Sequence, residues 1–404
     1  MKDGSASVSA SASASVGAVS KRVWSSDLHV APIADLKELW QHLLPRGVNV
    51  TVSDHSLSGA CKEKGTCKRG MPWLTGLRAE NPDESLAADF AREFSGGVDV
   101  DVFVCHHPAS LCTVFEQFGR ALWVHASTRY ELGKNESAAW REWNRRLAAW
   151  HEDDDGRSPR LQRVGHVIAA NNAYDAAYIQ HFTGIAAQYM PSYCDVGVVY
   201  TGPTAVSDRR VLLAMPQAVE NVLLPLIEAA ARKLGSSAQF VHVRRLYPRY
   251  KHEQLAAHPA VLHVPYQVSL MSVLEQYRAG IPIIVPSLAL LADWHVKHGL
   301  VFQKVWATVF GRESLKSAIE GHPLSHHGLL DPNAEHDAAA IAHWLAFSDF
   351  YTLPHVSTFD SFEHLVHVVD GTDWAAVSAR MRSANVQQRD RLLDAWAARF
   401  RALR

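Results

Sequence analysis

Apolar and polar residues alternate along most of this chain in two periods, one typical of strands and one typical of helices. Short apolar runs bounded by polar, Gly or Pro residues predict buried strands. The predicted strands cover residues 48–53, 98–105, 120–127, 164–171, 209–216, 238–245, 260–267 and 281–287. Strands that alternate with helices indicate parallel sheets covered by helices on both faces, which is an α/β fold.

Helical spacing is clearest in three segments. Residues 33–44 and 137–152 carry apolar side chains three and four positions apart. Residues 220–235 do so up to a Gly at the C-cap position. A shorter helix is expected over 110–119, soon after the strand that ends at Cys105.

The length of 404 residues exceeds the size at which one hydrophobic core usually stops growing, so two domains are expected. Residues 191–208 contain Pro and Gly but little helical periodicity, and we place the domain boundary there. The first doubly wound domain is expected over 21–195 and the second over 196–372. Residues 1–20 are Ser/Ala/Val low complexity without the features of a secretory signal or transit peptide, which indicates a disordered tail.

Composition argues against several classes of partner. Apolar residues make up 48% of the chain and charged residues 20%, as in an ordinary globular protein. The 40 basic and 41 acidic residues balance, which gives no electrostatic case for a nucleic-acid or membrane-surface partner. No run of 18 apolar residues appears, so no membrane span is expected.

The five cysteines leave the compartment open between the cytoplasm and the secretory-pathway lumen. Cys61 and Cys67 bracket a small loop that would close as a disulfide in an oxidising compartment. Neither this pair nor Cys105 and Cys112 has the spacing of a zinc knuckle. Two Asn-x-Ser/Thr sequons fit a lumen, but such triplets often arise by chance.

Ligands of doubly wound domains bind outside the carboxyl ends of the strands, where loops of both domains converge. The polar residues at those predicted positions are His106, His107, Thr128–Glu131, Asn171, Asn172, Arg244, Arg245 and Gln267–Glu275. A histidine with a near-neutral pKa suits a general base, so His106 and His107 are candidates, with Glu131 as the other. Asn171 and Asn172 either contact a ligand or cap the helix that follows.

Residues 263–287 combine several features of a nucleotide site. Pro265 and Tyr266 end a predicted strand. The hydrogen-bonding side chains at the start of the following helix are those of Gln267, Ser269 and Ser272. The N–H groups and the positive dipole end of that helix suit a phosphate. Glu275 can accept two hydrogen bonds from a vicinal diol such as ribose, or it lies on the solvated face of an amphipathic helix.

The segment LEQYRAGIPIIVPS (274–287) resembles the nucleotide-sugar signature of GT-B-fold glycosyltransferases, in which a helix Glu precedes an Ala/Cys-Gly-(Ile/Val)-Pro strand start. The resemblance implies that Glu275 grips the ribose of the donor nucleotide. Gln267, Ser269, Ser272 and Tyr266 are then expected beside the donor. Retaining members often carry a second Glu eight residues earlier, where this chain has Gln267. Retention or inversion of the anomeric configuration is therefore left open.

Two further segments carry the same resemblance. Residues 166–196 are similar to the end of a GT-B first domain, and residues 373–400 to a terminal helix pair that crosses back onto that domain. The resemblance covers about residues 22–400 and implies two Rossmann-like domains that face a cleft, with C-terminal helices over 373–404. Motifs such as HHPASLC and ASTRYELG are similar to glycosyltransferase-like proteins of algae, oomycetes and large algal viruses.

The resemblance implies a hexosyl- or pentosyltransferase. Such an enzyme moves a sugar from a UDP- or GDP-linked donor to a hydroxyl of a glycan or glycoconjugate acceptor. It needs no cofactor and no metal, because GT-B enzymes generally stabilise the leaving diphosphate with cations and helix termini. Among the basic residues of 243–251, Arg244 and Lys251 are the expected cations.

Other classes of protein were weighed against this one. A sugar-nucleotide epimerase shares the fold, and a non-catalytic nucleotide- or glycan-binding protein would bind without turnover. A metal-dependent GT-A transferase needs an Asp-x-Asp at a strand end, and the matches at 99–101 and 153–155 are in unsuitable places. A Rossmann dehydrogenase and a serine hydrolase are disfavoured because their Gly-x-Gly-x-x-Gly and Gly-x-Ser-x-Gly motifs are absent.

Overall fold

The computed structural model describes residues 18–54, 73–132, 134, 137–154, 165–203, 209–304 and 330–403. The tail expected over residues 1–20 is almost wholly outside these ranges, and so are Cys61 and Cys67. Both expectations stay predictions. No described helix has the length and the apolar character that crossing a membrane requires.

The first sheet has six parallel strands in the order β2-β1-β3-β4-β5-β6. Its strands are β1 (Val19–Ser26), β2 (Val48–Asp54), β3 (Val102–Cys105), β4 (Ala121–Ala126), β5 (Val167–Ala170) and β6 (Gln188–Tyr189). Its helices are α1 (Val30–Gln41), η1 (Leu44–Arg46), α3 (Gly76–Glu80), α4 (Glu84–Glu93), η2 (Ala109–Phe118), α5 (Ser137–Asp154) and α6 (Ala173–Thr183).

The second sheet has five parallel strands in the order β11-β10-β9-β7-β8. Its strands are β7 (Arg210–Ala214), β8 (Gln239–His242), β9 (Val261–His263), β10 (Ile283–Pro286) and β11 (Ser357–Phe359). The helices that follow them are α7 (Gln217–Leu234), α8 (Val243–Leu246), α9 (His252–Ala256), α10 (Met271–Arg278), α11 (Leu288–His298), α13 (Ala338–Leu345), α14 (Asp349–Thr352), α15 (Phe362–Gly371) and α16 (Trp374–Ala402).

Two doubly wound parallel sheets confirm the fold class predicted from the sequence, which is the two-domain Rossmann-like arrangement of GT-B proteins. Several elements differ from expectation, among them strand β11, which was not predicted. Strand β1 was not predicted, because Lys21 and Arg22 interrupt its apolar pattern. The helix expected over 110–119 is the 3-10 helix η2. The expected terminal pair is one continuous helix, α16, since no Gly or Pro interrupts residues 374–402.

Alternate residues of the first sheet supply two separate cores, as the period of two along a strand requires. Val102 and Val104 of β3 face a core that α1 and α16 complete. Phe103 and Cys105 face the opposite core, with η2 and the helices α4, α5 and α6. The sheet is therefore buried on both faces.

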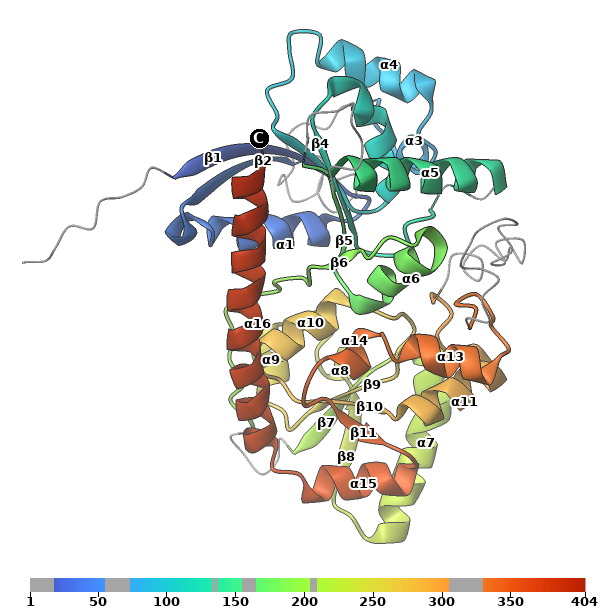
Figure 1. Ribbon diagram of the computed structural model, residues 1–404. Helices are drawn as coiled ribbons and strands as arrows, with labels where there is room; N and C mark the ends of the chain where they lie inside the picture. The colour runs from blue at the N-terminus through green and yellow to red at the C-terminus, as the bar shows by residue number, and fades with distance from the viewer. Residues whose placement is uncertain are drawn as a thin grey trace, which may run out of the picture.

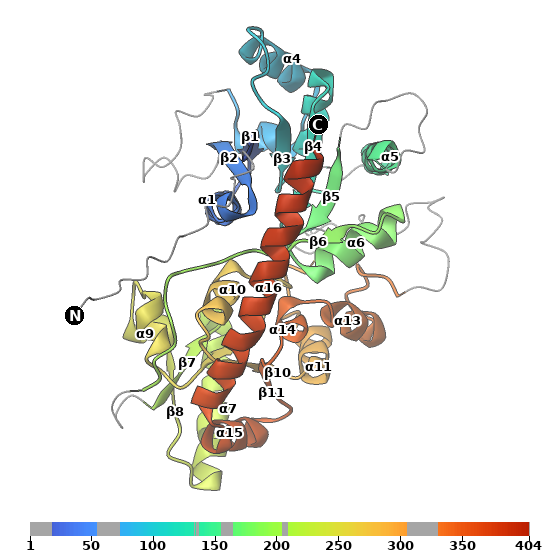
Figure 2. The same cartoon turned by 60° about the vertical axis from the view of Figure 1, so that its left-hand side comes forward.

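Helix α16 runs past both sheets and returns to the first one (Figures 1 and 2). Near its end, the Trp396 ring lies 5.4 Å from that of Trp40 on α1 and 5.6 Å from that of Trp123 on β4. Nearer its start, the Asn385 side chain accepts a hydrogen bond from Arg278 at 2.9 Å and donates one to the carbonyl of Tyr277 at 2.8 Å. One helix thus packs against both domains.

A second contact between the domains joins α6 to α13. The Trp344 ring of α13 lies 5.6 Å from the Tyr174 ring of α6, and Tyr178 donates a hydrogen bond to Asn333 at 3.2 Å. The three aromatic residues belong to the larger core of the first sheet, which continues into the second domain. The carboxyl ends of the two sets of strands are held toward each other by α16 and by this apolar contact.

Candidate functional site

A cavity of about 410 Å³ lies between the loops at the carboxyl ends of both sheets. Its volume falls in the range of small-molecule sites. The residues that line it are His29, Ala31, Pro32, His107, Ser127, Thr128, Arg129, Asn171, Gln267, Ser269, Leu270, Met271 and Gln303. The first eight belong to the first domain and the last five to the second, so the cavity is the cleft between the domains.

The strand order explains why the cavity lies here. The direction of winding reverses between β1 and β3 in the first sheet, and between β7 and β9 in the second. Loops after such a switch point diverge and leave a crevice. His29 follows β1, His107 follows β3, and the segment 267–271 follows β9. Both switch points therefore open into the same cavity.

Two histidines stack against each other in the first wall of the cavity. The rings of His29 and His107 are 5.4 Å apart at their centroids and nearly parallel, with an angle of 6°. Burial lowers the pKa of His29, and burial followed by the charges of His29 and Arg129 lowers the pKa of His107 further. Both imidazoles are therefore neutral near pH 7, and His29, whose pKa is lowered less, is the stronger base of the two.

The buried carboxyl group of Asp27 lies directly behind this pair. It accepts a hydrogen bond from the backbone N–H of His29 at 2.5 Å, and the Ser127 hydroxyl approaches its other oxygen at 3.5 Å. Burial raises the pKa of Asp27, and these hydrogen bonds oppose the effect. His29 is also the N-cap residue of α1, where the positive end of the helix dipole disfavours a charged imidazole.

Arg129 brings a buried cation to the same wall. Its side chain is 5% exposed, and Nε lies 3.8 Å from an Asp175 carboxylate oxygen. The guanidinium donates a hydrogen bond to Thr128 Oγ1 at 2.6 Å and lies over the Tyr174 ring at 5.8 Å. The loop after β4 and the start of α6 together hold the guanidinium at the cavity.

The second wall consists of amide and hydroxyl groups. Gln267 donates a hydrogen bond to Gln303, so two loops of the second domain meet at the cavity. Ser269 donates a hydrogen bond to the buried Asp349 at 2.5 Å. Burial raises the pKa of Asp349 to about 7, against the effect of the Ser269 hydrogen bond.

Helix α10 begins at the cavity. Its N-cap residue Leu270 and first residue Met271 both line the cavity, and the Leu270 side chain makes no capping hydrogen bond. The first N–H groups of a helix have no partner within the helix, and they favour an anion. The start of α10 thus lies at the cavity, and the phosphate site expected there stays a prediction.

Glu275 lies one turn further along α10. It is four residues after Met271 and so lies on the same side of the helix. One carboxylate oxygen lies 3.2 Å from His252 Nε2, and the side chain is 31% exposed. Glu275 does not line the cavity itself, so the ribose site predicted for it would be at the edge of the cleft.

The other predicted donor residues lie at varying distances from the cavity. Tyr266 precedes its lining segment and stacks on Phe302 with centroids 5.7 Å apart. Ser272 is half-buried in the first turn of α10 and does not line the cavity. Arg244 and Lys251 are exposed and also lie outside the lining. Arg244 lies over the Tyr250 ring at 6.0 Å.

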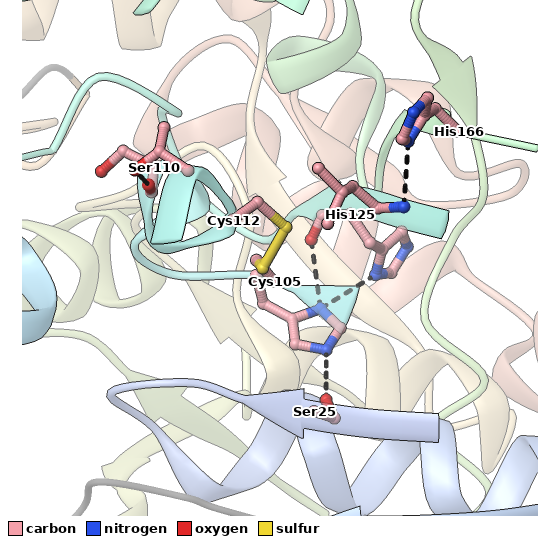
Figure 3. The surroundings of a disulfide bond; sticks show 9 residues. Ser25, Cys105, Ser110, Cys112, His125 and His166 are labelled. Atoms are coloured by element: carbon pink, nitrogen blue, oxygen red, sulfur yellow. Dashed lines mark hydrogen bonds between the residues drawn. A yellow bond between two sulfur atoms is a disulfide. The ribbon is translucent and has the colours of Figure 1, made fainter. Parts of the chain in front are cut away.

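His106 is placed behind the cavity and not in its lining. Its Nε2 lies 3.0 Å from Ser25 Oγ, and its Nδ1 lies 3.2 Å from the His125 carbonyl. Burial lowers the pKa of His106 to about 3, with His125 adding to the shift. Figure 3 shows this cluster beside a disulfide between Cys105 and Cys112. The bridge ties the end of β3 to η2, and it was not predicted.

Glu131 is likewise buried outside the lining. Tyr178 donates a hydrogen bond to its Oε1 at 3.2 Å, and Oε2 has no hydrogen-bond partner among the described residues. Burial raises the pKa of Glu131 to about 8, and Asp175 adds to the shift while Arg129 opposes it. The predicted roles of Glu131 and His106 in catalysis stay predictions, with no cavity contact to support them.

The two asparagines after β5 have different surroundings. Asn171 lines the cavity and can contact a ligand. Asn172 caps α6, because its side-chain oxygen accepts a hydrogen bond from the backbone N–H of Asp175 at 2.7 Å. Helix capping is thus confirmed for Asn172, and ligand contact by Asn171 stays a prediction.

Sequence reasoning missed Asp27 and His29 entirely. A prediction of strand β1 would have placed both at its carboxyl end, where doubly wound sheets bind ligands. Metal chemistry has no obvious location in the described ranges, where no three His, Cys, Asp or Glu side chains are grouped as metal ligands. Asp99 and Asp101, one of the Asp-x-Asp matches, instead bind Arg22 at the start of the first sheet.

Comparison with known proteins finds structures of similar fold at low sequence identity. No protein-family model matches the chain, and no curated protein matches it. The glycosyltransferase SnogD from Streptomyces nogalater is 13% identical over 96% of this chain and 100% of SnogD, with a TM-score of 0.44. UGT2 of Phytolacca americana, solved with UDP-2fluoro-glucose and pterostilbene, is 10% identical over 95% of this chain and 100% of UGT2, with a TM-score of 0.46.

A protein of Listeria monocytogenes described as a UDP-N-acetylglucosamine 2-epimerase is also similar in fold. It is 12% identical over 80% of this chain and 94% of its own, with a TM-score of 0.38. Transferases and an epimerase thus occur among the similar structures, and no argument below rests on them. The narrower resemblance to algal, oomycete and viral proteins stays a prediction.

Proposed function

We propose that this protein is a glycosyltransferase that transfers a sugar from a nucleotide-diphosphate donor to a hydroxyl acceptor in the cleft. The observation that carries the proposal is the composition of one cavity. Neutral histidines, of which His29 is the stronger base, lie on its first wall, and the start of helix α10, which has no side-chain cap, lies on its second. A base for an acceptor hydroxyl and a site for a leaving phosphate are two groups that inverting glycosyl transfer uses.

The donor would bind against the second domain. Its diphosphate would lie at the start of α10 beside Gln267 and Ser269, which line the cavity. Glu275 would accept hydrogen bonds from the ribose, one turn further along the same side of the helix. The nucleotide is UDP or GDP in this proposal, and the sugar is a hexose or pentose.

His29 is the favoured general base. Its imidazole lines the cavity, its pKa is lowered, and His107 stacked on one face restricts its orientation. The acceptor oxygen would attack the anomeric carbon while its proton passes to the His29 imidazole. The bond between that carbon and the donor phosphate oxygen would break, and its electron pair would leave with the diphosphate. A single displacement of this kind inverts the anomeric configuration.

Binding of the donor can be tested by thermal shift. UDP, GDP and their sugars are screened against the wild type, Glu275→Ala and a control variant, Glu253→Ala on the neighbouring helix α9. The correct nucleotide should raise the melting temperature of the wild type and the control, and raise that of Glu275→Ala less. A nucleotide that stabilises all three proteins equally would remove the ribose assignment.

Catalysis is tested with the nucleotide sugar that binds. Incubation with a panel of glycan and glycoconjugate acceptors should yield a glycosylated product and free nucleoside diphosphate. Formation of an epimer from the nucleotide sugar alone would instead identify the epimerase alternative. Binding with neither product would identify the non-catalytic alternative. The anomeric configuration of any transfer product, read by NMR, tests the proposed single displacement.

A further inference from the structure

The described lining of the cavity contains a cation, Arg129, which the sequence placed at a predicted strand end without indicating a role for its charge. Among the described residues that line the cavity, Arg129 is the only Lys or Arg. It follows strand β4 of the first domain, across the cavity from the Gln267–Met271 segment of the second. Arg244 and Lys251, the cations expected from the sequence, lie outside the lining.

Several groups hold the Arg129 guanidinium in place at the cavity. The Nε–Oδ1 distance of 3.8 Å to Asp175 allows attraction between the charges but is too long for a hydrogen bond. Asp175 itself accepts a hydrogen bond from Asn172 Nδ2 at 2.6 Å, which draws its other oxygen toward the helix cap. The guanidinium also donates a hydrogen bond to Thr128 and lies over the ring of Tyr174.

An anionic ligand suits this charge better than a neutral one. His29 and His107, the other titratable residues of the lining, are neutral near pH 7 because burial lowers their pKa. A planar guanidinium with five donors matches phosphate oxygens in a bidentate way. The start of α10, on the opposite wall, also favours an anion. Two anion-binding groups from different domains thus face the same cavity.

We propose that Arg129 binds the diphosphate of the donor from the first domain, opposite the start of α10, and stabilises its charge as the sugar leaves. The proposal rests on the proposed function for the presence of a nucleotide sugar. It adds a catalytic residue to it and replaces Arg244 and Lys251 in that role. Since the two anion contacts come from different domains, the diphosphate would also connect the two walls of the cleft.

The proposal is tested by isothermal titration calorimetry, which measures the affinity of the protein for five probes. The probes are uridine, UDP, guanosine, GDP and inorganic pyrophosphate. One of the nucleoside diphosphates should bind the wild type at least about tenfold more tightly than its nucleoside. Arg129→Gln should lower that diphosphate affinity about 10- to 100-fold, as expected for a charged hydrogen bond, and change nucleoside affinity less than about twofold. Pyrophosphate binding should weaken in parallel.

Because Arg129→Gln leaves Asp175 buried without its cation, the double variant Arg129→Gln/Asp175→Asn provides a neutral pair that folds more readily. It should show the same selective loss. Arg78→Gln is the matched control, since Arg78 also pairs with a partly buried acid, Asp89, but lies outside the cavity. This control should bind every probe as the wild type does.

The experiment distinguishes failure of the role proposed for Arg129 from failure of the proposed function. A double variant that keeps the full preference for diphosphate over nucleoside overturns the role of Arg129, and so does loss of that preference in Arg244→Gln instead. Pyrophosphate binding that depends on Arg129, with no nucleoside or nucleotide bound, would support the anion site and contradict the proposed function. A wild type that binds none of the five probes would overturn both.

Discussion

The two walls of the cleft are built in different ways. The first wall comes from four separate strand ends, and its lining or the layer behind it includes Asp27, His107, Arg129 and Asp175. These groups are titratable, and each is at least nine-tenths buried. The second wall comes mainly from one continuous segment, 267–271, and presents amides, hydroxyls and the start of a helix, with the buried acid Asp349 behind Ser269.

This difference suggests a division of work. Buried ionisable groups cost free energy of folding, and their pKa values shift, so they suit proton transfer and charge stabilisation. Neutral hydrogen-bonding groups cost less to bury when they are paired, and they suit recognition and positioning. We therefore expect variants of the first wall to affect stability and rate, with Arg129 affecting donor affinity as well, and variants of the second wall to affect mainly binding.

The largest expected effect is on the rate of transfer. His29→Gln removes the favoured base, so kcat should fall about 10²- to 10⁴-fold. Donor affinity should change by less than about twofold, because His29 is expected to contact the acceptor, while the donor diphosphate is expected between Arg129 and the start of α10. Steady-state kinetics with the identified acceptor and titration of the donor measure the two quantities.

His107→Gln is the matched control for His29. It removes the stacked partner and should lower kcat by less than about tenfold, through looser positioning of the base. If His107→Gln instead shows the larger loss and His29→Gln retains most of the activity, the base is His107. A loss of donor affinity in His29→Gln as large as its loss of rate would break the proposed division between the walls.

The second prediction compares the stability of the two walls. Asp175→Ala removes the buried partner of Arg129 and should lower the free energy of unfolding by about 3–5 kcal/mol. Gln267→Ala removes one hydrogen bond between half-buried amides and should cost about 1 kcal/mol. Denaturant unfolding of both variants measures the difference. If both variants lose the same free energy of unfolding, the buried charges of the first wall do not make it more sensitive to substitution than the second wall.

The second wall was the more predictable from the sequence, for a physical reason. Its ligand-facing groups lie within a few residues of each other, so the strand end, the polar turn and the helix start of 263–287 were visible as one pattern. Even there, Gln303 was missed, because its contact with Gln267 joins positions 36 residues apart in the chain. A sequence pattern therefore predicts a site well only where the residues of that site are close together in the sequence.

The first wall depends on elements that local pattern describes poorly. Strand β1 has a polar run that includes Lys21 and Arg22 in its first half, and this run hides the strand from the apolar pattern. Without the strand, Asp27 and His29 have no visible strand end. His106 and His107 are adjacent in sequence, yet only His107 lines the cavity because consecutive residues point to opposite sides. The alternation that revealed the sheets could not show which face of each loop meets the other domain.

The third prediction concerns how the free energy of unfolding depends on pH through the buried carboxyl group of Glu131. The pKa of Glu131, raised to about 8, exceeds its unfolded value near 4.5, so the folded state binds the proton more tightly. The stabilisation is complete below the unfolded pKa and is lost as pH rises toward 8. Between pH 6.5 and 8, the free energy of unfolding should fall by about 1–2 kcal/mol from this group.

Glu131→Gln imitates the protonated carboxyl and should remove that part of the pH dependence. Denaturant unfolding at pH 6.5, 7.25 and 8 compares the variant with the wild type. Asp349 loses stabilisation in the same direction around its pKa of about 7, so some slope should remain in Glu131→Gln. An unchanged slope in the variant would mean that Glu131 is already ionised in the folded protein.

The smallest expected effect is on the stability of glycine variants, and it tests the packing of the turn after α10 against α16. Gly280, in the turn between α10 and β10, has a φ of +72°, and a Cβ built there would lie 2.7 Å from Arg382 Cγ and 3.0 Å from Ser378 Oγ on α16. Gly47 has nearly the same φ, +74°, with nothing within 4 Å. Gly47→Ala should therefore cost about 1 kcal/mol from backbone strain alone.

Gly280→Ala should cost about 1 kcal/mol more than Gly47→Ala, because the exposed Arg382 side chain must also move away from the new methyl group. Parallel denaturant unfolding of the two variants isolates this difference, since the strain is common to both. Donor affinity should fall only in Gly280→Ala, because its turn ends the helix that carries Glu275. Equal costs and unchanged affinity would show that the second wall does not depend on close packing against α16.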